Sequence, residues 1–153
     1  MIAVVRVRGT VNVDKGIKKT LELLRLFKPN HLAIVGGEKV SLKMVEKAKD
    51  YVTFGEIEAK TLAMLLEKRG RLEGDKKLGA EFLKENNAKD FGDAAKKILE
   101  GKTSLKELKV KPVFRLHPPR KGHERAGIKK PFKSGGALGF RGAEINALIK
   151  SMM

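Results

Sequence analysis

This chain of 153 residues has no cysteine and no apolar stretch long enough to span a membrane. It contains no cysteine, which excludes disulfide scaffolds, thiolate metal sites and cysteine nucleophiles. Its apolar runs stay near five residues, as at 62–66, whereas a membrane helix needs roughly 20. Met1 is not followed by the basic start and apolar run of a secretory signal. We therefore expect a cytoplasmic protein that does not contact a membrane.

Catalytic and ligand-binding constellations are equally scarce. The three histidines, His31, His117 and His123, have no second imidazole or carboxylate at a metal-ligand spacing of three or four residues. The carboxylates are scattered, and none is set in an apolar context that would raise its pKa for acid-base work. We expect no metal site, no cofactor, no small-molecule substrate and no enzymatic activity.

Positive charge is what the chain has in excess. It carries 34 Lys and Arg against 18 Asp and Glu, a formal net charge of +16, which points to a polyanionic partner. The excess is largest between Lys111 and Gly142, where nine basic residues accompany the single acid Glu124 and four of the five prolines. We interpret this stretch as a basic arm that buries too little apolar surface to adopt a fixed conformation without a partner.

Hydrophobic periodicity predicts a β-α-β-α-β order in the first third of the chain. Strands are expected over 2–8, 32–35 and 51–54. Asp14 is expected to cap the first helix, which Pro29 would end, and Ser41 to cap the second, over 41–49. Valines alternate with Arg6 and Arg8 in the first strand, so one face of that strand should be cationic.

The remainder is predicted to be mainly helical. Further elements are expected as helices over 58–68, 79–87 and 90–100, a fourth strand over 113–116, and a last helix over 143–150. We divide one compact domain into a core over 1–57, a helical segment over 58–110 and the basic arm with its final helix over 111–153. The predicted fold class is α+β, with helices on one face of a small sheet.

The composition of the basic regions separates several kinds of polyanion binding. Only Tyr51 and Phe54 share a predicted strand, so a base-stacking sheet is not indicated. Neither a recognition helix nor sustained heptads are found, and the Pro- and Gly-rich arm is not an amphipathic membrane helix. Backbone and shape recognition of folded RNA remains, with Arg and Lys on loops where main chain can approach phosphates.

One enzyme family offers an alternative. The stretch Arg6–Gly16 after the first strand looks like the opening of the acylphosphatases, in which a glycine-bounded loop and an arginine hold a phosphate. The likeness is partial, because Gly16-Ile17-Lys18-Lys19 stands where that family has a Phe-Arg pair. The predicted second helix also departs from that family's β-α-β-β-α-β order. An acylphosphatase-like phosphohydrolase with a ferredoxin-like fold is therefore kept as the alternative.

Several motifs in order resemble the large-subunit ribosomal protein L-thirty family. They are Val5–Gly9, Thr20–Leu26, Glu67–Gly70, Arg115–Gly122, Gly135-Gly136 with Gly139, and Glu144–Lys150. The later motifs favour the longer archaeal and eukaryotic form, called L-seven in eukaryotes. The chain has no basic extension before Ile2, so the archaeal form fits better.

The resemblance implies a structural constituent of the large ribosomal subunit that binds ribosomal RNA (rRNA). It further implies neighbouring ribosomal proteins as partners, a position near the five-S RNA, and a ferredoxin-like core with a three-stranded antiparallel sheet. The RNA-binding residues expected from matching motifs are Arg6, Arg8, Arg25, Lys28, Lys68, Arg69, Arg71, Arg115, Arg120 and Lys121, and charge alone adds Lys129, Lys130, Lys133 and Arg141.

Structural roles compete with RNA contact at several of these positions. Arg6 and Arg8 could simply keep the edge of a sheet soluble. Arg25, Lys28, Lys68 and Arg69 could stabilise the C-terminal ends of helices through the helix dipole.

Overall fold

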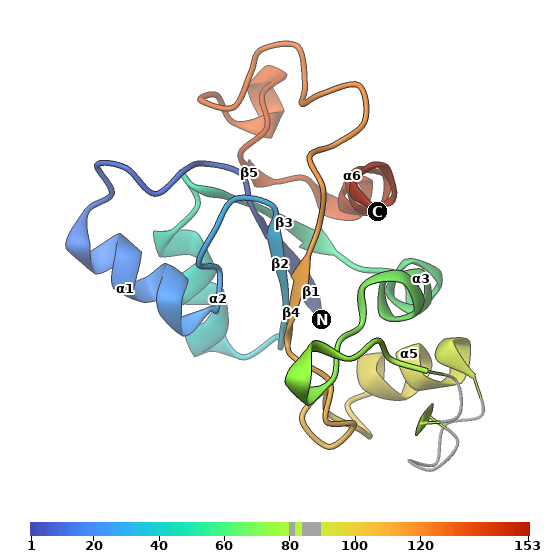
Figure 1. The fold of residues 1–153 in the computed structure, drawn as a ribbon. Helices are drawn as coiled ribbons and strands as arrows, with labels where there is room; N and C mark the ends of the chain where they lie inside the picture. Colours follow the sequence, from blue (N-terminus) through green and yellow to red (C-terminus); the bar gives the residue numbers. More distant parts are fainter. Residues whose placement is uncertain (80–81, 84–89) are drawn as a thin grey trace.

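A computed structural model describes residues 1–79, 82–83 and 90–153. Within these residues a single sheet has the strand order β4-β2-β1-β3-β5 (Figure 1). The strands are β1 (Ile2–Arg6), β2 (His31–Val35), β3 (Val52–Glu56), β4 (Val113–Arg115) and β5 (Gly139–Phe140). All neighbours are antiparallel except β5, which runs parallel to β3. The expected α+β class and antiparallel three-stranded centre are confirmed, and the last third of the chain adds one strand at each edge.

The helices follow the predicted order. They are α1 (Lys15–Leu23), α2 (Lys39–Lys47), α3 (Ala59–Arg69), α5 (Phe91–Leu99) and α6 (Ile145–Met152), with 3-10 turns η1 (Glu73–Asp75), η2 (Phe132–Ser134) and η3 (Gly142–Glu144). The Asp14 side chain caps α1 as expected, accepting from the N–H groups of Gly16 and Ile17 at 2.8 and 3.3 Å. The helix expected over 79–87 lies outside the described residues, apart from Gly79, Phe82 and Leu83.

Two helix boundaries differ from the prediction. The first helix ends well before Pro29, because Arg25 adopts a left-handed backbone with φ of 60°. The N–H groups of Arg25 and Leu26 then donate to the carbonyls of Glu22 and Leu21, which closes the helix as a Schellman motif. The second helix starts two residues before Ser41, with Glu38 at the N-cap position. Ser41 therefore lies inside α2 and does not cap it.

Helices cover both faces of the sheet, not one face as predicted. Figure 1 shows α1 and α2 on one side and α3, α5 and α6 on the other. Val4 packs with Leu21 and Val45 on the first side, whereas its neighbours Ala3 and Val5 pack into the larger cluster on the second. Because Ala3, Val4 and Val5 are all fully buried, β1 is a central strand that both layers require to be apolar.

The end of the chain docks closely against β3. A side chain at Gly55 would collide with the carbonyl of Gly142, so this close approach requires glycine. The buried amide of Asn146 donates to the carbonyls of Glu56 and Ala143 and accepts from the N–H of Glu58. The larger apolar cluster includes residues from 1–57, 58–110 and 111–153, which supports the proposal that the three segments fold as one domain.

Candidate nucleic-acid interface

Arg6, the first arginine predicted to contact RNA, is buried. Its side chain at the end of β1 is in a residue only 4% exposed, and its guanidinium donates to the carbonyls of Leu26, Phe27, Arg8 and Gly9 at 2.7 to 3.1 Å. Burial lowers the pKa of Arg6, but a guanidinium stays charged at neutral pH. The expected exposed cationic face at Arg6 is therefore wrong, and the guanidinium organises two loops at the end of the sheet.

The same observation bears on the phosphohydrolase alternative. A phosphate-binding arginine needs donors that are open to the ligand, whereas the donors of Arg6 already face carbonyl groups. Arg8 packs its guanidinium over the Tyr51 ring at 4.8 Å and donates to the carbonyl of Asp50 at 3.2 Å. The loop after β1 thus does not present Arg6 to a phosphate, and one donor and one face of the Arg8 guanidinium are already engaged.

Arg141, just after β5, is buried as well. Its side chain is 3% exposed and forms an ion pair with Glu124. The guanidinium also donates to the Thr53 hydroxyl at 2.9 Å and the Ala137 carbonyl at 3.2 Å, and lies 4.5 Å from the centre of the Phe132 ring. Arg141 therefore connects β3 to three points of the basic arm.

The basic arm has a defined conformation of its own, contrary to the expectation that only a partner would fix it. The ion pair between Glu124 and Arg141 is one of the contacts that fix it. Burial raises the pKa of Glu124, but the hydrogen bond and charge of Arg141 outweigh this effect, so the pKa lies below its ordinary value and the carboxylate stays charged in the pair. Backbone hydrogen bonds join Phe132 to Leu138 and Leu138 to Lys130. Leu138 and Ala137 are buried against Val7. One buried ion pair and a small apolar cluster thus supply what the composition of the arm lacks.

Four cations gather at the β4 edge of the sheet, and we call them the β4-edge cluster. They are Lys28, Arg71, Lys111 and Arg115. Lys111 and Arg115 form ion pairs with Asp75 at 2.7 and 2.9 Å, and Arg71 donates to the Asp75 carbonyl at 3.3 Å. The hydrogen bond from Lys111, together with the charges of Arg115 and Lys111, lowers the pKa of Asp75. This cluster therefore includes its own counter-charge.

His31 lies beside the β4-edge cluster. Its backbone pairs with Arg115 across β2 and β4. Burial first, and then the charges of Arg115, Lys28 and Arg6, lower the pKa of His31. The imidazole is accordingly neutral at physiological pH.

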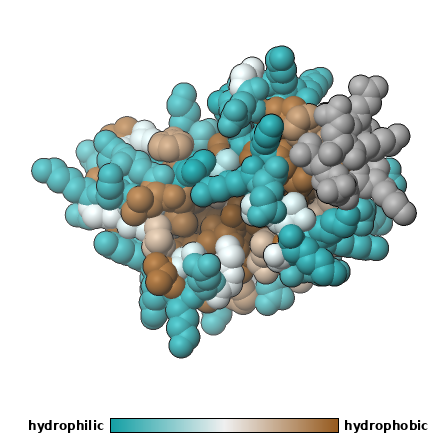
Figure 2. Space-filling view, turned by 90° about the horizontal axis from the view of Figure 1, so that it is seen from below, coloured by the Kyte–Doolittle hydropathy of each residue, from teal (hydrophilic) through white to brown (hydrophobic). Residues whose placement is uncertain are grey.

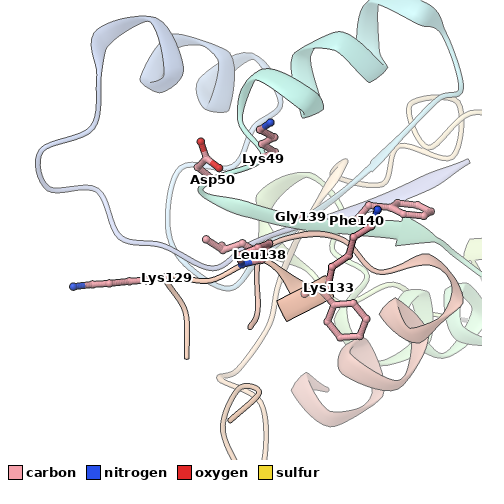
Figure 3. Close-up of a pocket in the computed structure, with 9 residues that line it drawn as sticks. Lys49, Asp50, Lys129, Lys133, Leu138, Gly139 and Phe140 are labelled. Carbon is pink, nitrogen blue, oxygen red and sulfur yellow. The ribbon is translucent and has the colours of Figure 1, made fainter. Parts of the chain in front are cut away.

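A second group of cations lies at the β5 edge, and we call it the β5-edge cluster. It consists of Arg8, Lys49, Lys129 and Lys133, and the three lysines line a pocket of about 430 Å³ (Figure 3). Within the described part of the chain, none of these three ammonium groups forms an ion pair with a carboxylate. The β5 edge thus carries positive charge that is open to an external anion.

Comparison with known proteins identifies the family. The sequence model described as "Ribosomal protein L30p/L7e" matches residues 2–52. Large ribosomal subunit protein uL30 of Nanoarchaeum equitans is 52% identical over 149 residues, which cover 97% of this chain and 96% of the relative. The chain belongs to the uL30 family. The uL30 proteins of Methanococcus maripaludis and Methanococcus vannielii are 49% and 50% identical over 151 residues, covering 99% of this chain and 98% of each relative.

The family assignment confirms the resemblance seen in the motifs. The basic residues predicted to bind RNA, from the motifs or from charge alone, differ in their exposure. Arg25, Lys28, Lys68, Arg115, Arg120, Lys121, Lys129, Lys130 and Lys133 are exposed, whereas Arg8, Arg69 and Arg71 are partly buried. Arg69 donates to the carbonyl of Met153 at 3.0 Å, so it satisfies the C-terminal end of α6. Arg120 and Lys121 lie on a loop beside the end of α6. The backbone N–H of Arg120 donates a hydrogen bond to the carbonyl of Ser151 in α6.

Motif reasoning missed two members of the uL30 chain's basic surface. Lys49 follows α2 and Lys111 precedes β4, and neither falls in a motif that carried the resemblance. Lys49 is sequence-adjacent to Asp50 and would be taken for a solvated helix end. Only the fold places Lys49 beside Lys129 and Lys133, some 80 residues later in the chain.

The end of the sheet where β1 begins and β2 ends is mainly apolar, unlike the two cationic edges. A hollow of about 560 Å³ is lined mainly by apolar residues, among them Leu24, Ile34, Met44 and Leu105, and Arg25 is one of its polar lining residues. Figure 2 views the molecule from this end and shows apolar surface inside a frame of hydrophilic side chains. Among the described residues, no helix could cross a membrane, and no group of three or more His, Asp or Glu is placed to hold a metal ion.

Proposed function

We propose that this uL30-family chain is a structural constituent of the large ribosomal subunit in the cytoplasm, where it binds rRNA and catalyses no reaction. The observation that carries the proposal is that two clusters of cations, the β4-edge cluster and the β5-edge cluster, lie at opposite edges of one sheet. Family membership over nearly the full chain supports the ribosomal setting.

The separation of the clusters suggests how the protein would act. At the usual spacing of β-strands, the two edge strands of a five-stranded sheet lie about 19 Å apart. A cluster at each edge can neutralise the phosphates of a different RNA segment, with the rigid sheet fixing the distance between them. The protein would therefore hold two parts of folded rRNA together. The family resemblance adds the five-S RNA and neighbouring ribosomal proteins as proposed partners.

Salt dependence of binding tests this proposal. Purified protein should bind large-subunit rRNA with a log–log salt slope of about −0.9 for each duplex phosphate contacted. With six contacts the affinity should fall by about three orders of magnitude between 50 and 200 mM salt. Hydroxyl-radical footprinting at 50 mM salt should show two separate protected segments. A slope near zero, or a single protected segment, would contradict a two-edge RNA binder.

A further inference from the structure

The pocket at the β5 edge has the size and form of a small-ligand site. Its volume of about 430 Å³ falls within the range of roughly 300–1,000 Å³ that is common for such sites. Its walls come from the segment after α2, at Lys49 and Asp50, and from the basic arm, at Lys129 and Lys133. Figure 3 shows Leu138 between these walls, with Phe140 following it along the chain.

The lining combines an apolar interior with a cationic rim. Leu138 is buried, whereas the Phe140 ring belongs to a residue that is 50% exposed. Three lysines line the pocket together with these apolar groups, and Asp50 is the acidic residue of the lining. A flat apolar ring beside unpaired ammonium groups matches a nucleotide, because a base stacks on aromatic rings while its phosphate attracts cations.

The aromatic ring and the arm beneath it are already in position. Phe140 pairs with Phe54 of β3, with ring centres 5.7 Å apart and planes tilted by 50°. The Thr53 hydroxyl donates to the Gly139 carbonyl at 3.0 Å, and the Arg141 N–H donates to the Phe54 carbonyl at 3.0 Å. A ring that is held in this way loses little conformational entropy when a ligand stacks on it.

The backbone of the arm also fixes the opposite wall. The N–H of Gly136 donates to the Pro131 carbonyl at 3.0 Å, and a Cβ at Gly136 would collide with the backbone of Lys130. The Arg141 guanidinium lies over Phe132, the residue directly before Lys133. The segment that carries Lys129 and Lys133 is therefore held against the sheet before any ligand arrives.

We propose that this pocket holds one unpaired nucleotide of RNA, whose base stacks on Phe140 and whose phosphates are neutralised by Lys49, Lys129 and Lys133. This proposal rests on the proposed function, since it assumes that RNA is the partner at the β5 edge. It adds that the edge recognises a base that has left its helix, besides the phosphate backbone.

Two exposed phenylalanines provide a matched test. Phe140→Leu keeps an apolar side chain but removes the stacking ring, and Phe27→Leu makes the same change at a ring that is 52% exposed outside the pocket. The probe is large-subunit rRNA of Methanococcus maripaludis, whose uL30 protein is 49% identical to this chain. The dissociation constant is measured together with the reactivity of unpaired bases toward dimethyl sulfate.

The expected result is specific to Phe140. Phe140→Leu should weaken binding at least about fivefold and restore the reactivity of one base that the wild-type protein protects, because stacking of a base on an aromatic ring is worth that much or more. Its salt slope should stay unchanged, and its melting temperature should fall only by the small amount expected for loss of the aromatic pair with Phe54. Phe27→Leu should change neither affinity nor protection.

Asp50→Asn tests the sign of the ligand's charge. Removing a carboxylate from the rim should strengthen binding of an anionic nucleotide, whereas weaker binding would indicate a cationic ligand such as a basic protein segment and would overturn the proposal. Unchanged affinity and protection in Phe140→Leu, with a normal salt slope, would overturn the nucleotide pocket and leave the proposed function standing. Failure of the wild-type chain to bind the rRNA would overturn both.

Discussion

The two edges of the sheet each carry a cluster of four cations, but among the described residues only cations of the β4-edge cluster form ion pairs with a carboxylate of the protein. At the β4 edge, Lys111 and Arg115 share the carboxylate of Asp75, so part of the positive charge is neutralised within the protein. At the β5 edge, Lys49, Lys129 and Lys133 line a pocket together with apolar and aromatic groups, and Arg8 donates to a backbone carbonyl. An anion at the β4 edge must compete with Asp75, whereas one at the β5 edge meets open ammonium groups.

The difference shows that counting basic residues does not define an interface. Arg6 and Arg141 add to the net charge, yet both are buried and donate to the protein's own oxygens. The buried Arg141 is nevertheless what positions the open lysines, because it holds the arm to β3. The β5 edge therefore depends on an internal arginine in a way that the β4 edge does not.

The largest expected effect comes from removing that internal arginine. Arg141→Ala leaves Glu124 without its partner and the Thr53 hydroxyl and Ala137 carbonyl without their donor. We expect a loss of about 2–4 kcal/mol in the free energy of unfolding, measured by urea denaturation, because two buried hydrogen-bond acceptors and the partly buried Glu124 carboxylate lose their partner. Arg125→Ala, at an exposed position on the same arm, should change it by less than about 0.5 kcal/mol.

Acid should reduce the difference between wild type and Arg141→Ala. The pKa of Glu124 is below its ordinary value of 4.5 in the folded protein, so its ion pair contributes fully above that value and is lost as pH falls through the folded-state pKa. Denaturation at pH 7 and near pH 3 measures this change. A difference independent of pH would show that the guanidinium acts through its other hydrogen bonds alone.

Features set by local sequence could be predicted, whereas features set by tertiary contacts could not. The Asp14 cap, the β-α-β-α-β order and the strand at Val113–Arg115 follow from local signals, and all are present. Burial of Arg6 could not be predicted, because a valine-arginine alternation describes a half-exposed strand equally well until the second helical layer is placed. The two residues of β5 lie in a glycine-rich stretch that is too short to show a period, and they pair with β3 only through the tertiary fold.

The comparison of edges predicts unequal losses of RNA affinity. Lys129→Ala with Lys133→Ala should lower the magnitude of the salt slope for rRNA binding by about 2, since each lysine is free to neutralise one phosphate. Lys111→Ala with Arg115→Ala should lower it by less, because both side chains already form ion pairs with the Asp75 carboxylate. Lys60→Ala with Lys96→Ala, two exposed lysines on α3 and α5, is the control. Equal slopes for the two edge variants would remove the distinction drawn between them.

Asp75→Asn should make the β4 edge behave more like the β5 edge. Without the carboxylate, Lys111 and Arg115 are free to interact with phosphate, so rRNA affinity at 100 mM salt should rise by a few-fold. The matched control is Glu73→Gln, which removes an exposed charge from the same 3-10 turn. Equal gains from both variants would mean that net charge alone, not release of the β4-edge cations, determines affinity.

The smallest expected effect concerns Arg25, which belongs to neither cluster and has a left-handed backbone at the end of α1. Glycine adopts this conformation without strain, so Arg25→Gly should raise the free energy of unfolding by about 0.5–1 kcal/mol, while Arg25→Ala should not. Both variants remove the same charge, so filter-binding titrations should give them the same rRNA affinity. If that affinity equals the wild-type value, Arg25 does not contact RNA. If both variants bind more weakly to the same extent, the arginine is retained at a strained position for its charge.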